Sequence, residues 1–169
     1  MRTAALSLTA IATIFLWSFV AQPKLVITSS AFTQNGMIPA QYSCEGGEMS
    51  PPFMAGGIPS NTQTLALILH DPDAPMKGGL THWVMWNIDA TGNVSENFKG
   101  AMQGVNTAKQ NGYKGMCPPS GTHHYHFMVY ALDTKLDLPT TTDKAGLEKA
   151  MKGHILAQGD LVGLYKKMK

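Results

Sequence analysis

Charged residues are sparse in this sequence, and their signs nearly cancel. Only 14% of the 169 residues are Asp, Glu, Lys or Arg, and the formal net charge is +2. A charge this small gives no argument for nucleic acid as a partner. Aromatic residues are modest at 8%, whereas glycine (17) and proline (10) are plentiful. This mixture favours one turn-rich β or α+β domain over a helical bundle, in a chain long enough to bury a hydrophobic core.

The motifs that mark common metal, phosphate and nucleophile sites are also absent. The sequence has no glycine-rich phosphate loop, no CxxC pair and no HExxH helix. Asp71, His82 and His123 are of metal-binding types, but they lack the tight spacing of a zinc motif. Neither Ser50 nor Ser120 lies in a GxSxG elbow. We therefore expect no metal and no cofactor.

The amino terminus differs in kind from the rest. Arg2 precedes an almost uncharged apolar stretch, residues 4–21, a pattern typical of an export signal. If the chain is cut after residue 21, Phe19 stands three residues before the cut, where a small residue is expected. About 18 apolar residues also suffice to span a bilayer as a helix. Residues 1–24 are therefore interpreted as an export signal or an uncleaved membrane anchor, and we expect a periplasmic or secreted protein.

The rest of the chain, residues 25–169, is interpreted as one domain of strands and turns. The dense Gly, Pro and Ser content of residues 42–59 predicts an ordered loop, and residues 93–111 show no usable period. Helical spacing of apolar residues after Asp143, continuing to Ile155, predicts one helix, which Gly153 either ends or only interrupts. Apolar and β-branched runs predict strands at 25–28, 64–70, 83–88, 123–132 and 161–165.

Two short segments hold much of the ionisable chemistry. The first, Asp71-Pro72-Asp73-Ala74-Pro75, follows a predicted strand, and its prolines prevent that strand from continuing. Its carboxylates then belong either to a site at the strand end or to a turn in which Asp caps backbone amides. In the second segment, strand alternation places His123 and Tyr125 on one face and His124 and His126 on the other. His123 and Tyr125 are thus predicted to share a pocket, whereas the other histidines, His70 and His154 included, are predicted to be surface or hydrogen-bonded residues.

Only two cysteines are present, Cys44 and Cys117. Two cysteines in an exported protein are expected to form a disulfide, whereas in a cytosolic protein they are more often buried thiols. Both interpretations stay open, since the sequence does not give the distance between the two Cα atoms. The most specific hypothesis for an enzyme is a hydrolase in which Cys117 is the nucleophile and His123 lies beside it. That hypothesis fails if Cys117 is part of a disulfide.

Six segments spread over residues 42–157 resemble the phosphatidylethanolamine-binding protein family, in the bacterial and archaeal branch often called Raf kinase inhibitor-like. The resemblance implies a large antiparallel sheet packed on a smaller one. With the predicted helix, the expected fold class is mainly β (α+β) with a C-terminal helix. The segments, in the family's order, are YSCEGGEMSPP (42–52), DPDAP (71–75), HW (82–83), GYKGMCPPSGTHHY (112–125), the strand to residue 133, and AMKGHILA (150–157).

The resemblance also implies a small pocket that accepts phosphate-like or carboxylate groups, including phospholipid head groups. The expected ligand-binding residues are Asp71, Asp73, His82, Gly115, Pro119, His123 and Tyr125. Three departures from the family pattern are His124 for Arg, Met116 for Pro, and 53–55 for Leu-x-Trp. We expect the first to change the charge at the pocket rim and the others to change its wall.

These observations predict an exported ligand-binding or regulatory protein that is not an enzyme. Protonated imidazoles and the Tyr125 hydroxyl would donate hydrogen bonds to an anion, so binding should weaken as the pH rises. One alternative is an inhibitor that binds a protease or a kinase, although an exported protein would not meet its own cell's cytosolic kinases. The other is a hydrolase that uses Cys117 or His123.

Overall fold

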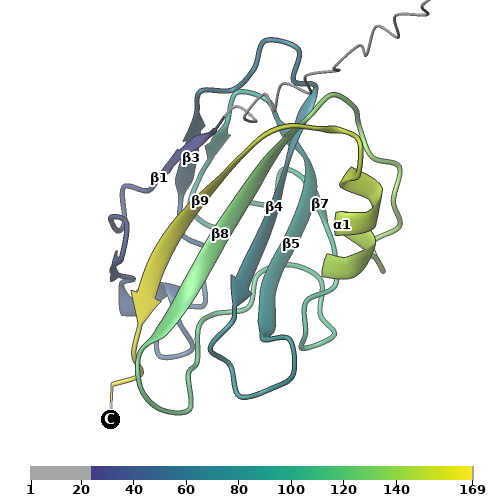
Figure 1. The fold of residues 1–169 in the computed structure, drawn as a ribbon. Coiled ribbons are helices and arrows are strands. Elements are labelled where there is room, and N and C mark those ends of the chain that lie inside the picture. Colours follow the sequence, from purple (N-terminus) through teal and green to yellow (C-terminus); the bar gives the residue numbers. More distant parts are fainter. Residues whose placement is uncertain (1–23, 169) are drawn as a thin grey trace, which may run out of the picture.

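The computed structural model describes residues 24–168, which form two β-sheets and one α-helix (Figure 1). The larger sheet has six strands in the order β2-β9-β8-β4-β5-β7, and the smaller has the order β1-β3-β6. All pairs are antiparallel except β2 with β9. The predicted fold class is confirmed. The elements are β1 (Val26–Thr28), β2 (Gly36–Met37), the 3-10 helix η1 (Ala40–Tyr42), β3 (Phe53–Gly56), β4 (Thr64–Asp71), β5 (Leu80–Asp89), β6 (Asn93–Val94), β7 (Met102–Gln103), β8 (His123–Leu132), α1 (Lys144–Met151) and β9 (Ile155–Tyr165).

The central strands are apolar on both faces because both faces of the large sheet are covered. In β4, Leu65, Leu67 and Leu69 belong to the main core, which lies between the two sheets. Ala66 and Ile68 point the other way, into a second apolar cluster beneath α1. Figure 1 shows the helix and the small sheet on opposite sides of the large sheet. Burial on both sides explains why β4 reads as a continuous apolar run and not as an alternating one.

The helix ends at Met151, so of the two alternatives for Gly153 the structure shows the one in which it ends the helix. Gly153 adopts φ 83°, a left-handed conformation typical of a helix end. Ile155 instead begins β9, which makes that strand longer than the predicted 161–165. The helix begins as predicted, with the Asp143 carboxylate accepting from the Gly146 amide at 3.0 Å. The segment 42–59 is not loop throughout, since β3 (Phe53–Gly56) pairs there with β1 and β6.

The predicted export signal or anchor falls almost entirely outside the described residues. Lys24 is the exception, and it already belongs to the domain through a parallel bridge to Gln158. Within residues 24–168, no helix is long and apolar enough to cross a membrane.

Candidate functional site

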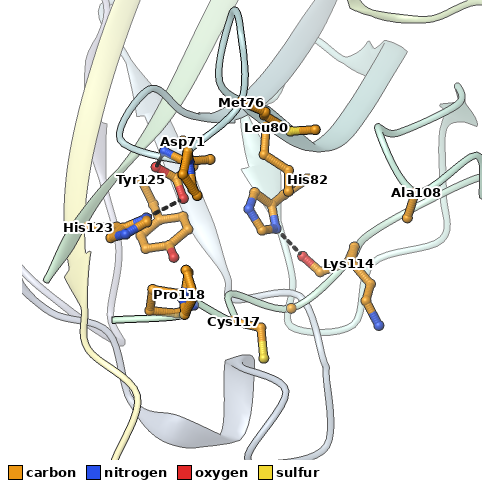
Figure 2. A pocket seen from close by; sticks show the side chains of 14 residues that line it. Asp71, Met76, Leu80, His82, Ala108, Lys114, Cys117, Pro118, His123 and Tyr125 are labelled. Atoms are coloured by element: carbon orange, nitrogen blue, oxygen red, sulfur yellow. Dashed lines mark hydrogen bonds and ion pairs between the residues drawn. The ribbon is translucent and has the colours of Figure 1, made fainter. Parts of the chain in front are cut away.

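A cavity of about 340 Å³ opens at the end of the large sheet where β4 ends and β5 and β8 begin (Figure 2). Six of the seven residues predicted from the sequence line it: Asp71, His82, Gly115, Pro119, His123 and Tyr125. Their contact with a ligand remains a prediction. The other lining residues are Ala74, Pro75, Met76, Leu80, Ala108, Lys114, Cys117 and Pro118.

Asp71 joins the turn after β4 to the pocket. Its Oδ1 accepts from the backbone N–H groups of Asp73 (2.9 Å) and Ala74 (3.1 Å). Its Oδ2 accepts from His123 Nδ1–H at 2.8 Å, and both side chains are buried. The Asp71 carboxylate therefore caps the turn and also lines the cavity, and its role in a site stays a prediction. The pair fixes the orientation of the His123 ring at the cavity wall.

Asp73 does not line the cavity, so its placement in the site is corrected. Its carboxylate accepts from both the backbone N–H (2.8 Å) and Nδ1 (2.7 Å) of His124. The hydrogen bond from the His124 side chain is the main reason that the pKa of Asp73 is lowered. The physical reason for the error is that β4 has ended by residue 73, so the turn directs this second carboxylate to the surface.

His82 reaches the cavity because of a β-bulge. Leu69 pairs with Trp83 and His70 with Thr81, so His82 has no partner in β4 and is an inserted residue. An insertion reverses the alternation of side chains. His82 and Trp83 therefore both face the main core side, where the His82 ring meets Tyr125 edge-on with centroids 5.3 Å apart.

The His82 ring has a determined tautomer. Its Nδ1 lies 2.8 Å from the carbonyl oxygen of Lys114, which can only accept, so Nδ1 carries a hydrogen. Its Nε2 is buried and has no hydrogen-bond partner among the described residues. Burial, above all, lowers the pKa of His82. Near neutral pH the ring is therefore uncharged and presents a lone pair on Nε2.

The Tyr125 hydroxyl is the second polar atom at the base of the cavity. It too is buried without a partner within the described chain. Burial first, and the negative charge of Asp71 second, raise the pKa of Tyr125, so the hydroxyl keeps its proton. Buried polar groups nearly always have partners, and two of the four buried side-chain polar atoms without one in the described chain belong to residues that line this cavity.

A disulfide holds the wall opposite these residues. Cys44 and Cys117 are bonded, with Cα atoms 5.5 Å apart, and the Cys44 amide donates to the Met116 carbonyl oxygen at 3.1 Å. Gly115 is required here by close approach, because an added Cβ would lie 2.8 Å from the Ser43 carbonyl carbon. The bridged Cys117 has no free thiolate, so the cysteine nucleophile hypothesis fails.

Two of the three departures from the family pattern do not lie where they were expected. His124 is exposed and paired with Asp73, and its expected effect on the charge of the pocket rim stays a prediction. Met116 is fully buried, and its sulfur accepts from the Tyr113 hydroxyl at 3.1 Å. Phe53 belongs to β3 in the core. Neither Met116 nor Phe53 lines the cavity, so the expected change of its wall is wrong.

The remaining histidines are surface or hydrogen-bonded residues, as predicted. His126 and His154 pair with carboxylates of Asp160 and Asp133, each at 2.8 Å, and His70 contacts the Thr81 hydroxyl at 3.2 Å. Between residues 24 and 168, no group of three or more His, Cys, Asp or Glu side chains is arranged to hold a metal ion.

Sequence reasoning missed the apolar part of the site. Leu80 and Met76 lie on one side of the cavity and Pro118 on the other (Figure 2). Pro118 adjoins the predicted Pro119, and Leu80 lies two residues before His82, so proximity was the available signal. Lys114, also missed, is engaged by both carboxylate oxygens of Glu48, at 2.8 and 3.0 Å.

Comparison with known proteins shows the family of this chain. The sequence profile described as phosphatidylethanolamine-binding protein matches residues 28–166. The chain belongs to the phosphatidylethanolamine-binding protein family. A UPF0098 protein of Methanothermobacter thermautotrophicus is 45% identical over 150 residues, covering 83% of this chain and 98% of the relative. A UPF0098 protein of Chlamydia muridarum is 42% identical over 146 residues, covering 83% of this chain and 97% of the relative.

Solved structures of the family have the same fold. The phosphatidylethanolamine-binding protein homologue CT736 of Chlamydia trachomatis has a TM-score of 0.83 and 38% identity, covering 86% of this chain and 99% of that one. YbcL of E. coli is described as a member of the mammalian phosphatidylethanolamine-binding protein family. It has a TM-score of 0.79 and 29% identity, covering 88% of this chain and 100% of that one. A carboxypeptidase Y inhibitor bound to its cognate proteinase has a TM-score of 0.51 at 19% identity, covering 89% and 86%, and shares the fold alone.

His82 should make the protein less stable in mild acid. Its pKa is lowered in the folded state, whereas in the unfolded chain it is about 6.5. As the pH falls below that value, the unfolded state binds a proton that the folded state refuses. This group therefore removes up to about 1.4 kcal/mol of stability per pH unit until its folded pKa is passed.

Urea unfolding between pH 7.5 and 5 tests this expectation. His82→Asn keeps a donor for the Lys114 carbonyl and cannot titrate, so its free energy of unfolding should fall less steeply with acid than that of the wild type. Exposed His154→Asn serves as the control and should change the slope little. Equal slopes for His82→Asn and the wild type would contradict the assignment.

Proposed function

We propose that this protein binds a small ligand through a phosphate-like or carboxylate group in the cavity, and that it is an exported binding or regulatory protein without catalytic activity. The observation that carries the proposal is the pair of orphaned polar atoms, His82 Nε2 and the Tyr125 hydroxyl. The family's name supports ligand binding, and the apolar segment at residues 4–21 supports export.

The remaining lining supports a ligand with an apolar body behind its acidic group. Met76, Leu80 and Pro118 supply apolar walls, and the polar groups gather around Asp71. A cavity of about 340 Å³ is at the small end of ligand sites in proteins. A phosphate ester of a small alcohol or phenol fits this description, and so does the head-group end of a phospholipid.

Tyr125→Phe is expected to weaken binding of phenyl phosphate about tenfold, because it removes one buried donor, a loss of about 1.4 kcal/mol. The ring stays, so the free energy of unfolding should change by less than about 1 kcal/mol. Tyr130→Phe, on the opposite face of β8, is the matched control and should bind like the wild type. Calorimetric titration gives the affinities, and unchanged affinity in Tyr125→Phe would contradict the assigned site.

Turnover assays separate binding from catalysis. The purified protein is incubated with carboxylic ester, phosphoester and peptide substrates, and we expect no turnover above that of His123→Ala. Hydrolysis that disappears in His123→Ala would overturn the non-enzymatic proposal. Fractionation of cells that express the full-length chain tests export, and recovery in the cytoplasm alone would contradict it.

A further inference from the structure

The base of the cavity offers an acceptor where an anion would require a donor. His82 Nδ1–H donates to the carbonyl oxygen of Lys114, so the ring's one hydrogen on nitrogen is engaged there. The orphaned Nε2 therefore presents a lone pair to the cavity. A fully ionised phosphate or carboxylate has only lone pairs of its own. Placed against Nε2, such a group would bring two acceptors together with no hydrogen between them.

The charges around His82 do not compensate for this mismatch. From β4, Asp71 contributes a carboxylate, and His70 lies on the other face of the same strand. From β8, His123 is bonded to Asp71, and Tyr125 is uncharged. Lys114 is the one Lys or Arg side chain among the described lining residues, and Glu48 holds its ammonium group. No unengaged fixed cation therefore faces the base to favour a dianion.

We propose, on the basis of the proposed function, that the acidic group of the ligand binds with one proton still attached to an oxygen. The resulting O–H group donates to His82 Nε2. A phosphate monoester in its monoanionic form meets the geometry. Its P–OH supplies the missing donor, and another of its oxygens accepts from the Tyr125 hydroxyl. Both orphaned atoms are then satisfied by one tetrahedral group, since the His82 and Tyr125 rings meet with centroids 5.3 Å apart.

Phenyl phosphate and phenyl sulfate form a matched pair of probes. Both are tetrahedral esters with the same apolar ring. The phosphate monoester keeps one proton below its second pKa of about 6, whereas the sulfate ester carries none. At pH 5.5 we expect phenyl phosphate to bind at least about tenfold more tightly than phenyl sulfate, the difference made by one buried hydrogen bond.

The dependence of this difference on pH isolates the proton of the ligand. Titration of groups that do not touch the ester acts on both ligands alike, so the ratio of the two affinities removes it. Protonation of His82 is different, because it would turn Nε2 into a donor and reduce the preference for phosphate. Above about pH 6, the affinity for phenyl phosphate should fall about tenfold per pH unit relative to phenyl sulfate. Calorimetry at pH 7.5 in two buffers with different ionisation enthalpies should show about one more proton taken up with the phosphate than with the sulfate.

Substitution at His82 assigns the acceptor. His82→Asn retains a donor toward the Lys114 carbonyl but removes Nε2, so the preference for phosphate over sulfate should disappear. His154→Asn, at an exposed histidine paired with Asp133, should keep the preference. Equal affinity of the wild-type protein for both esters, with one shared pH profile, would overturn this inference and leave the proposed function standing. Absence of saturable binding for both esters would overturn the proposed function and this inference with it.

Discussion

Asp71→Ala is expected to lower the free energy of unfolding by about 3 kcal/mol, because it leaves buried hydrogen-bond donors without their acceptor. The change leaves His123 Nδ1 without its acceptor in a site where the two side chains are only 4% and 9% exposed. It also removes the acceptor of two backbone amides in the turn after β4. Ligand binding should be lost with it, since the His123 ring is no longer oriented.

The neighbouring pair provides the control. Asp73 and His124 have nearly the same geometry, with Oδ2 and Nδ1 2.7 Å apart, but their side chains are 41% and 53% exposed. Solvent screens such a pair, so Asp73→Ala should cost at most about 1 kcal/mol. Urea unfolding at pH 7 measures both variants. Similar losses for the two would contradict the buried role of Asp71.

Loss of the disulfide is expected to have the largest effect on stability. Cys44 and Cys117 are separated by 73 residues, and closing a loop of this length stabilises a protein by about 4 kcal/mol in the chain-entropy model. The double variant Cys44→Ser/Cys117→Ser should lose that amount. It should also bind phenyl phosphate more weakly, because the bridge fixes residues 114–119 along the cavity wall.

Thiol titration of the unfolded, unreduced protein tests the bridge directly and should find no free thiol. Adding a reductant should destabilise the wild type but leave the double serine variant unchanged, which separates reduction of this bond from other effects of the reagent. Two free thiols in protein recovered from an oxidising compartment would contradict the assignment.

The sequence predicted the parts of the site that depend on local rules. Alternation along β8 placed His123 and Tyr125 together, because a regular strand has a period of two. The apolar run of β4 predicted a buried strand, and the prolines after Asp71 predicted its end. The convergence of these segments came from the family resemblance, since no local pattern specifies which strand ends meet.

The features that local sequence rules could not supply depend on contacts between distant residues. His82 faces the cavity through a bulge that is visible only once β4 and β5 are paired. Its tautomer is set by the carbonyl of Lys114, 32 residues away. β3 is a strand because β1 and β6 lie on either side of it, and its own sequence between glycines and prolines gave no such signal. The divergence of Asp71 and Asp73 likewise depends on their separate histidine partners.

The edges of the large sheet have a consequence for self-association. The outermost strands of the large sheet, β2 and β7, have two residues each. The long strand β9 pairs with β2 at Gly163 and Leu164, and with Lys24 at Gln158. Long unpaired strands attract further strands and seed aggregates. Short edges on the described part of this protein offer little backbone for a second copy to extend. Accordingly, the protein should remain dispersed at concentrations where an open sheet of this size would stack edge to edge.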